Sequence, residues 1–501
     1  MTASLTRAEK LQKLAQAKQQ LGALLPLSAT QQRFWFIEQL DTASGLNNIF
    51  KAQFITEPLD ISLLQQALHT ITQRQPALVS RFINTRNGPR QYTVPAPATL
   101  IKLQEVATLD EAKTLASTDA RQGFALSSQL PFRCTLYQLP QQQYLLTLCI
   151  HHIVADGYAL NLILSELHSL YSQLQGQQLP ALPLPAIDMQ QYLQQQQLTT
   201  TQQSEQFWQS TLQHCEYQLQ LSRHTDSADN AGDYYYFSLP AGLSGQITLY
   251  CQQQQITPFN LLLACFNILL HKLSSQRNFI VATPVLNRDQ PQLKHFVASV
   301  ANTLLLPAAI DSNMAAGQYV QQLRQQFYQC LAHQQLGYSQ ILELLKPERD
   351  INRNPLFQVM FSYNALQDAI TAAADNWQSC AIQRHYAKLD LTLELTCQQG
   401  AYHGYFEYNK ALFSAQDISR YADFFAEVAE QLIRQPQRPL AQLALSSLTQ
   451  QQQLLSHPPL PAAENDLMSA LTKTADRIPQ QPALTLTDSG QQLNYRQLWQ
   501  L

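Results

Sequence analysis

The chain has 501 residues, 45% of them hydrophobic, and a formal net charge of −3 at pH 7. This length allows two or more folding units, each with a substantial core. A charge close to neutral excludes the basic footprint of a nucleic-acid or anionic-membrane binder. No apolar run has the length of a membrane span, and the N-terminus lacks the apolar core of a signal peptide. The eight cysteines lack paired CxxC spacing. We therefore expect a cytoplasmic protein with reduced, structural thiols.

The first 22 residues predict an amphipathic helix. Thr6 and Glu9 stand at the spacing of a capping box, and Leu11, Leu14 and Leu21 give the helix an apolar side. Two interpretations remain open at this point. The helix packs on its own domain, or it docks an upstream protein.

Helices and strands alternate irregularly after this segment. We expect short strands over residues 47–57 and 92–104, with a helix at Ile61–Gln73 between them. Tyr144–Ile150 is an apolar, β-prone run, which predicts a buried strand. A helix with leucines on one face follows Gly157, and a proline-bearing linker comes after it.

A second half begins near residue 200. It contains an apolar helix at residues 258–273, a strand at Phe279–Pro284, an antiparallel pair at Asp390–Leu395 and Gly404–Tyr408, and a helix at residues 414–433. A polar linker over residues 446–465 and a final segment over 466–501 follow. Because strict βαβ alternation is lacking, the pattern predicts an α/β protein with mixed sheets.

The stretch His151-His152-Ile-Val-Ala-Asp156-Gly157 carries the most chemical information. An imidazole that titrates near neutrality, at the end of a strand and before a turn, is well placed to handle a proton. Adjacent residues on a strand point to opposite faces, so a shared metal ion is unattractive and we assign no metal site. One ring would face a cavity and the other the interior. Taken alone, the stretch is also compatible with a core histidine and an ordinary turn.

Several segments resemble the condensation domains of nonribosomal peptide synthetases, in the order in which that family carries them. His151–Gly157 resembles the HHxxxDG motif, and Ser28–Phe36 resembles the opening motif SxAQxRLWxL. Thr283–Asp289 is similar to TPVxNRD, Val300–Leu304 to FVNTL, and Arg349–Phe361 to the long RDxSRNPLFQVMF segment. The match runs from about residue 25 to 445.

Two of the family's motifs match only in part. Gln75 and Pro76 stand where the second motif usually has His-Glu, and Gly337 stands where proline is common in the motif after His333. The last segment, with Pro482–Leu484 and Leu493–Leu498, resembles the opening of an adenylation domain. We therefore expect a piece of a longer protein, cut just inside that next domain.

The resemblance implies two chloramphenicol-acetyltransferase-like lobes in a V with a central tunnel. The first lobe would occupy residues 24–180, and the linker and second lobe residues 181–445. Two carrier proteins would deliver phosphopantetheine arms to the tunnel, so no cofactor binds the domain itself. The implied activity is that of an acyltransferase, which joins a donor acyl or peptidyl thioester to the amine of an acceptor aminoacyl thioester.

The resemblance also assigns roles to residues. His152 and Gly157 would be catalytic, the histidine as base or as positioning group and the glycine amide as an orienting donor. His151 would support the loop, and Asp156 would pair with Arg288 to hold it. Asn302 would lie near the substrate channel.

Alternatives to this assignment concern the donor and the activity. Arg33 in the opening motif favours a domain that takes an L-configured donor. If Met1 is the natural start, the donor would come from another synthetase through the N-terminal helix, or as a fatty acyl group in a starter domain. A non-catalytic recruitment domain is disfavoured because relatives of that kind usually lose a histidine of the motif. Expected partners are the donor and acceptor carrier proteins and the adjoining adenylation domain.

Overall fold

The computed structural model describes residues 24–40, 45–197, 202–221, 231–348, 353–364, 376–383, 385–446, 467–485 and 490–500. The chain divides into two compact units, residues 1–445 and 446–501. The N-terminal segment expected to form a helix and most of the expected linker at 446–465 lie outside the described residues.

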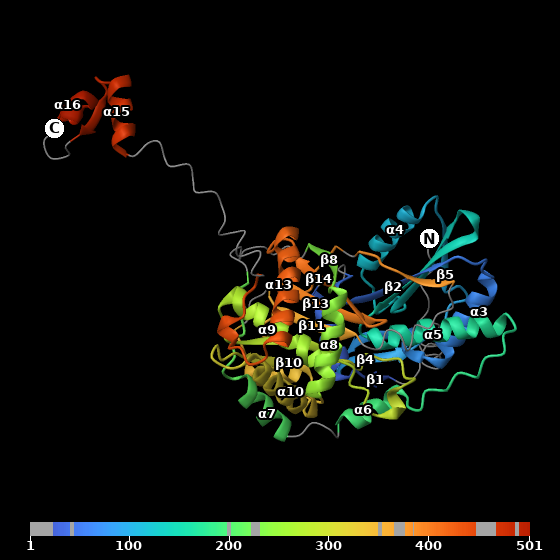
Figure 1. Ribbon diagram of the computed structural model, residues 1–501. Helices are drawn as coiled ribbons and strands as arrows, with labels where there is room; N and C mark the ends of the chain where they lie inside the picture. The colour runs from blue at the N-terminus through green and yellow to red at the C-terminus, as the bar shows by residue number, and fades with distance from the viewer. Residues whose placement is uncertain are drawn as a thin grey trace. The chain divides into compact units, whose positions relative to one another are not determined.

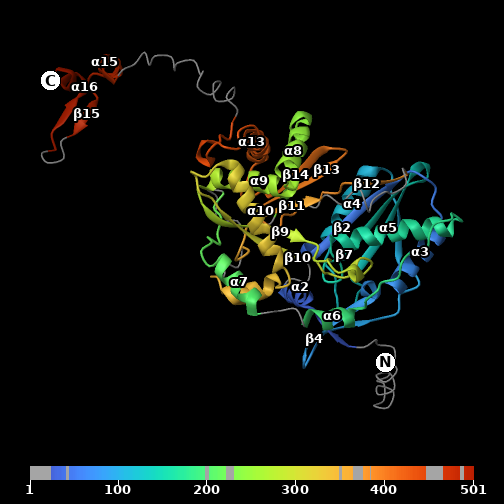
Figure 2. The same ribbon diagram turned by 60° about the horizontal axis from the view of Figure 1, so that its bottom comes forward.

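The first lobe is built on a mixed five-stranded sheet with the order β12-β2-β7-β6-β5 (Figures 1 and 2). Its strands are β12 (Trp377–Cys380), β2 (Asn48–Ile55), β7 (Gln143–His151), β6 (Phe132–Leu139) and β5 (Ile101–Glu105). All neighbours are antiparallel except β5 and β6, which are parallel. A small antiparallel sheet of β1 (Leu25–Pro26), β4 (Gly88–Thr93) and β3 (Ser80–Thr85) adjoins it.

Helices cover both faces of the five-stranded sheet. The helices of this lobe are α2 (Ala29–Leu40), α3 (Ile61–Arg74), α4 (Leu109–Arg121) and α5 (Gly157–Leu174). Leu146 and Leu148 of β7 share a core with α3 and α5, whereas Leu145 packs in a separate core with α4. This division follows from the alternation of side chains along a strand. β7 is therefore buried on both faces, in agreement with its apolar sequence.

The second lobe contains a mixed six-stranded sheet, β10-β9-β11-β13-β14-β8. These strands are β10 (Asn302–Ala309), β9 (Asn278–Val285), β11 (Val359–Asn364), β13 (Leu391–Gln398), β14 (Ala401–Asn409) and β8 (Gly232–Ser238). The helices of this half are α6 (Met189–Gln197), α7 (Gln202–Leu212), α8 (Ala241–Gln254), α9 (Pro258–Ser274), α10 (Ala316–Ala332), α11 (Tyr338–Leu345) and α13 (Ala415–Arg434). Every residue of α9 from Asn260 to Leu270 is buried. This explains why its sequence is apolar on all sides.

A contiguous division of the lobes at residue 180 does not describe the five-stranded sheet. Its edge strand β12 comes from residues 377–380 and pairs antiparallel with β2, with Trp377 opposite Ile55. Trp377 is 4% exposed and belongs to the core of the first lobe. The second half of the chain thus returns to complete the first sheet, a long-range pairing that local sequence patterns do not reveal.

The elements expected from the sequence are largely present. The helix over 61–73, the strand over 144–150, the apolar helix after Pro258 and the antiparallel pair β13–β14 all form. The single strand expected over 92–104 is wrong. β4 ends at Thr93 and β5 begins at Ile101, because Pro95 and Pro97 between them lack the N–H that a ladder requires.

No single helix of the described segments has both the length and the apolarity to cross a membrane, and α8 and α9 pass that test only as a pair bent by 112°.

The second unit consists of α15 (Leu467–Arg477), the antiparallel strands β15 (Pro482–Thr485) and β16 (Gln492–Asn494), and α16 (Tyr495–Gln500). All eight cysteines lie in described segments and are free thiols.

Candidate active site

The site is centred on the loop that joins β7 to α5. β7 ends at His151, and α5 begins at Gly157. The backbone N–H of His152 donates to the carbonyl of Asn47, at 2.7 Å, and so ties the loop to the start of β2. Asp156 is the N-cap of α5, since its side chain accepts the backbone N–H of Ala159 at 2.8 Å. An aspartate in this position satisfies one of the free N–H groups of the first helical turn.

His151 is buried, and both of its ring nitrogens are engaged. Nδ1 accepts the backbone N–H of Ile153 at 3.0 Å, and Nε2 lies 3.0 Å from Oε2 of Glu38. Because Nδ1 is an acceptor, a neutral ring carries its proton on Nε2 and donates it to Glu38. Burial lowers the pKa of His151, while the hydrogen bond to Glu38 acts in the opposite direction. His151 is thus held as a neutral ring in one tautomer.

His152 has different surroundings from its neighbour. It is half-buried, and its ring stacks on Phe34 with 4.8 Å between centroids and 19° between planes. Its Nδ1 is buried without a hydrogen-bond partner among the described residues. Burial lowers the pKa of His152 to about 3, and the positive charge of Lys388 adds to this, against the opposing effect of Asp156. At neutral pH the ring is uncharged and able to accept a proton or a hydrogen bond.

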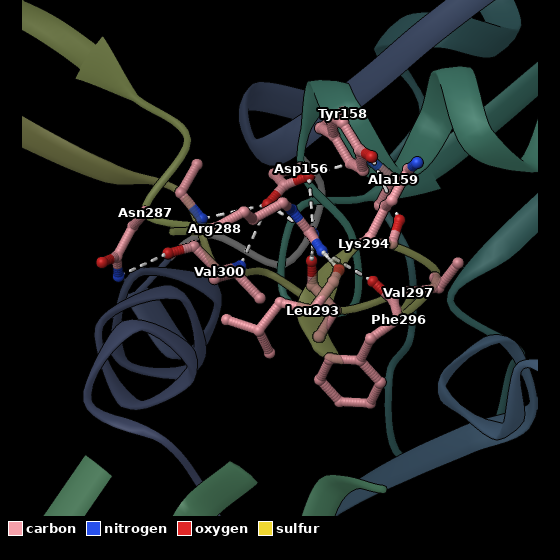
Figure 3. A network of polar contacts seen from close by, with 12 residues as sticks. Asp156, Tyr158, Ala159, Asn287, Arg288, Leu293, Lys294, Phe296, Val297 and Val300 are labelled. Carbon is pink, nitrogen blue, oxygen red and sulfur yellow. Dashed lines mark hydrogen bonds and ion pairs between the residues drawn. The ribbon is translucent and has the colours of Figure 1, made fainter. Parts of the chain in front are cut away.

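Asp156 and Arg288 form an ion pair between the two lobes (Figure 3). Nη2 of Arg288 lies 3.0 Å from Oδ2 and 3.2 Å from Oδ1 of Asp156, and the two side chains are 4% and 1% exposed. Oδ2 also accepts the backbone N–H groups of Val300 and Ala301, at 3.0 and 2.9 Å. The carboxylate therefore receives hydrogen bonds from both lobes, as a buried charge requires.

Arg288 organises the segment that follows β9. Its guanidinium donates to the carbonyls of Leu293 (2.7 Å), Phe296 (2.8 Å) and Ala298 (3.1 Å), and it lies 4.7 Å from the ring centroid of Tyr158. Tyr158 in turn donates its hydroxyl to the carbonyl of Lys294 at 3.1 Å. As Figure 3 shows, the Arg288 side chain lies beside the carboxylate of Asp156, and Leu293 and Phe296 lie on its other side.

The backbone conformation at position 157 does not require glycine. An Asp-Gly pair is typical of a turn, but Gly157 is not among the residues with positive φ. It is the first residue of α5, it is exposed, and a Cβ atom there would meet nothing within 4 Å. No described residue accepts its N–H, as is normal for the first turn of a helix. What glycine provides here is open space beside a free N–H at a helix N-terminus.

Asn302 is the first residue of β10, and its side chain is engaged by the protein. Its amide donates to the carbonyls of Gln334 (2.6 Å) and Leu336 (3.3 Å), and its Oδ1 accepts the N–H of Thr303 (2.8 Å). These bonds hold the segment between α10 and α11. The contacts give Asn302 a role in loop placement, and a role in a substrate channel remains a prediction.

Sequence reasoning missed Glu38, Phe34 and Gln75 as contributors to the site. Phe34 and Glu38 are four residues apart on α2, a spacing that places both on one face of the helix, toward the two histidines. Gln75, which departs from the family pattern, is 1% exposed. It donates to the carbonyl of His295 (3.0 Å) and accepts the N–H of Val297 (3.1 Å), and so links the first lobe to the segment that Arg288 organises.

Comparison with known families decides the assignment. Residues 23–455 match the condensation domain family. The chain belongs to that family. Phosphinothricin tripeptide synthetase PhsC from Streptomyces viridochromogenes is 31% identical over 496 residues, which cover 95% of this chain and 45% of that protein. Tyrocidine synthase 3 from Brevibacillus parabrevis is 27% identical over 485 residues, 94% of this chain and 7% of that protein. The chain thus spans less than half the length of these curated relatives.

Solved structures show the fold of this condensation domain. A holo four-domain nonribosomal peptide synthetase bound to AMP and glycine superposes with a TM-score of 0.83 at 23% identity, over 95% of this chain and 38% of that one. The first condensation domain of the CDA synthetase gives 0.72 at 18% identity, over 85% and 99% of the two chains. The expected fold of two chloramphenicol-acetyltransferase-like lobes is confirmed. Condensation domains are amide-bond-forming acyltransferases, so the enzyme class is also confirmed.

Proposed function

We propose that this domain joins a donor acyl or peptidyl thioester to the amine of an acceptor aminoacyl thioester, with both substrates carried on phosphopantetheine arms. The amine nitrogen attacks the thioester carbonyl, the C–S bond breaks, and the sulfur leaves with the proton lost by the nitrogen. A thioester is already activated, so the enzyme mainly has to hold the two groups together and manage that proton.

His152 is the residue that carries the proposal. Its ring is neutral near pH 7, and Phe34 fixes its plane. Because Nδ1 is buried without a partner among the described residues, the ring lacks the second acceptor that stabilises an imidazolium in a catalytic triad. This supports a role in which His152 accepts a hydrogen bond from the attacking amine and orients it, more than a role as a full proton carrier. The amine, with a pKa of about 8, reaches the site in its neutral form in sufficient amount at about pH 7–8.

Gly157 supplies the second contribution. Its N–H lies in the first turn of α5, at the positive end of the helix dipole. A donor in this position favours negative charge on the oxygen of the thioester carbonyl as the amine attacks. His151, Asp156 and Arg288 hold the loop on which both groups lie and do not touch substrate in this proposal.

For the finer assignment, we infer an L-configured donor from Arg33 in the opening motif. We infer as partners the donor and acceptor carrier proteins and the adenylation domain whose opening residues 466–501 resemble. An upstream synthetase that docks through residues 1–22 is the alternative source of the donor. The relatives above are whole synthetases, and the 95% coverage of this chain by PhsC carries the similarity past residue 455, which supports a continuing adenylation domain.

The test is a product-formation assay with loaded carrier proteins and the His152→Ala variant. We expect the rate of amide formation to fall by about 10²-fold, the loss expected when a reacting group is no longer held in position. His214→Ala, which removes an exposed imidazole, is the matched control and should keep the wild-type rate. An unchanged rate in His152→Ala would show that the proposed role is wrong.

The same assay separates the donor classes. Carrier-bound donors ending in an L- or a D-residue are compared with a medium-chain acyl-CoA. Faster turnover of the L-donor supports the assignment. Preference for the acyl-CoA would identify a starter domain, and equal failure of all donors with an intact fold would favour a recruitment domain.

A further inference from the structure

Glu38 is a buried carboxylate that the proposed chemistry does not use directly. It lies on α2 and is 2% exposed as a residue. Oε2 is 3.0 Å from Nε2 of His151, while Oε1 is buried without a partner among the described residues. A buried carboxylate with only half of its acceptor capacity filled is costly to keep, so its position calls for an explanation.

The hydrogen bonds of His151 show what Glu38 does. Nδ1 of the ring accepts the N–H of Ile153, which forces the ring proton onto Nε2. That proton needs a buried acceptor, and Glu38 provides it. Without an acceptor at this point, the ring would either leave the Nε2 proton buried and unbonded or turn and release Ile153.

The same face of α2 also contacts the rest of the loop. Gln31 donates its side-chain amide to the carbonyl of Ile153 at 3.2 Å, and Phe34 stacks on His152. Gln31, Phe34 and Glu38 are spaced three and four residues apart, so one stripe of the helix supports both imidazoles and the residue after them. These contacts fix the positions of His151 and His152 relative to α2.

We propose that Glu38 is a positioning residue for the condensation reaction, and that its carboxylate holds His151 in the tautomer that fixes the loop carrying His152. This inference rests on the proposed function of His152. Among the described residues, the hydrogen bond of the Glu38 carboxylate is to His151, so Glu38 acts through the loop. A hydrogen-bond acceptor is required in this position, and a negative charge is not.

Two substitutions separate the acceptor from the charge. Glu38→Gln keeps an oxygen that accepts the Nε2 proton and should retain kcat within about threefold of wild type. Glu38→Leu removes the acceptor and should lower kcat by about 10- to 100-fold with little change in KM, the range expected for a misplaced reacting group. Glu166→Leu is the matched control, because Glu166 has an equally buried carboxylate that pairs with Arg74. It should lose stability and keep kcat within about twofold.

A second measurement reads the tautomer directly. Nuclear magnetic resonance spectra of the full chain with ¹⁵N-labelled histidine should show that His151 is protonated on Nε2 and not on Nδ1. Glu38→Gln and His152→Ala should keep this pattern, and Glu38→Leu should change it. This readout does not depend on activity, and a general loss of stability would not produce it.

The outcomes are distinct for the two proposals. If wild type forms amide, His152→Ala does not, and folded Glu38→Leu keeps the wild-type rate, the role of Glu38 is refuted and the proposed function stands. If Glu38→Leu does not fold, Glu38→Gln decides: a loss as large as that of His152→Ala would overturn the acceptor role. If wild type itself forms no amide, the proposed function fails, and the tautomer measurement still tests the contact between Glu38 and His151.

Discussion

The two ends of the loop between β7 and α5 differ in how their polar atoms are satisfied. At the Asp156 end, both carboxylate oxygens and the two Nη atoms of Arg288 take part in eight hydrogen bonds or ion-pair contacts. Nε of Arg288 is the one side-chain nitrogen or oxygen of this pair that is buried without a partner among the described residues. At the histidine end, Nδ1 of His152 and Oε1 of Glu38 have no partner among the described residues. His152 and Asp156 are four positions apart, so most polar atoms are bonded at one end of the loop and fewer are bonded at the other.

This difference indicates that the two ends have different roles, one structural and one chemical. A buried carboxylate with hydrogen bonds to both of its oxygens has one favourable geometry, so it fixes the loop and the lobe contact. The His152 ring has a bond still to make and so has capacity left for a substrate. It is supported by Phe34, which stacks on it, and through the loop by Glu38, which bonds His151. The same loop therefore combines a rigid anchor with a reactive group.

The ion pair of Asp156 and Arg288 is the anchor of the loop, and substitutions in it should have the largest effect on stability. We expect Asp156→Asn and Arg288→Met each to lower the free energy of unfolding by about 3–5 kcal/mol, since each leaves one buried charge without its partner. The double variant should cost clearly less than the sum, because neither charge is then left behind. Urea denaturation followed by circular dichroism measures all three variants.

The control for this experiment is a more exposed pair in the same lobe. Arg133 and Asp119 lie 2.9 Å apart, but their side chains are 24% and 18% exposed. Asp119→Asn should cost only about 1 kcal/mol, because water partly replaces the lost partner. Strict additivity in the Asp156 and Arg288 variants, or a loss no larger than in this control, would contradict the description of the pair as the anchor.

A substitution at Phe34 tests whether its stack on the His152 ring contributes to the reaction. Phe34→Leu keeps an apolar side chain but removes the aromatic face against His152, which is worth about 0.5–1.5 kcal/mol. If the stacked geometry is needed in the reaction, kcat should fall by about 2- to 12-fold. Trp35→Phe is the neighbouring control. It loses the 2.8 Å bond from Nε1 to Asn84 and should reduce stability without changing kcat. Equal effects on kcat in the two variants would argue against a specific role for the stack.

Much of the fold was predictable from the sequence because its elements are locally encoded. The apolar run of β7 and the leucine face of α5 predict their own burial, and His151 and His152 could be assigned to opposite environments from strand alternation alone. The contact between Asp156 and Arg288 followed from the family resemblance. The two residues are 132 positions apart, and no local pattern joins them.

The rest depended on long-range packing. β12 joins the first sheet from residue 377 onward, and Gln75 reaches the segment around His295, contacts that depend on how distant parts of the chain come together. Gln75 also shows how a mismatch can mislead. It looked like a weakened motif, although its amide supplies both a donor and an acceptor to the second lobe. Glu38 could have been found by asking which α2 residues share a face with Phe34.

Of the substitutions considered near His152, Lys388→Met should have the smallest effect, and it is tested through the pH dependence of the rate. The pKa of His152 lies at about 3, so its ring stays neutral from about pH 5.5 to 9 and adds no inflection there. The rate should therefore rise with pH through a single inflection at about 8, where the acceptor amine loses its proton.

Lys388→Met removes a positive charge that lowers the pKa of His152, so the pKa should rise in this variant. Burial is the larger cause of the low pKa and remains, so the pH profile should keep its shape. The measurement is kcat/KM across this range for both proteins. A second inflection between about pH 6 and 7 that is present in either protein would mean that His152 titrates in the working range, and that its environment is far less dry than the stack on Phe34 indicates.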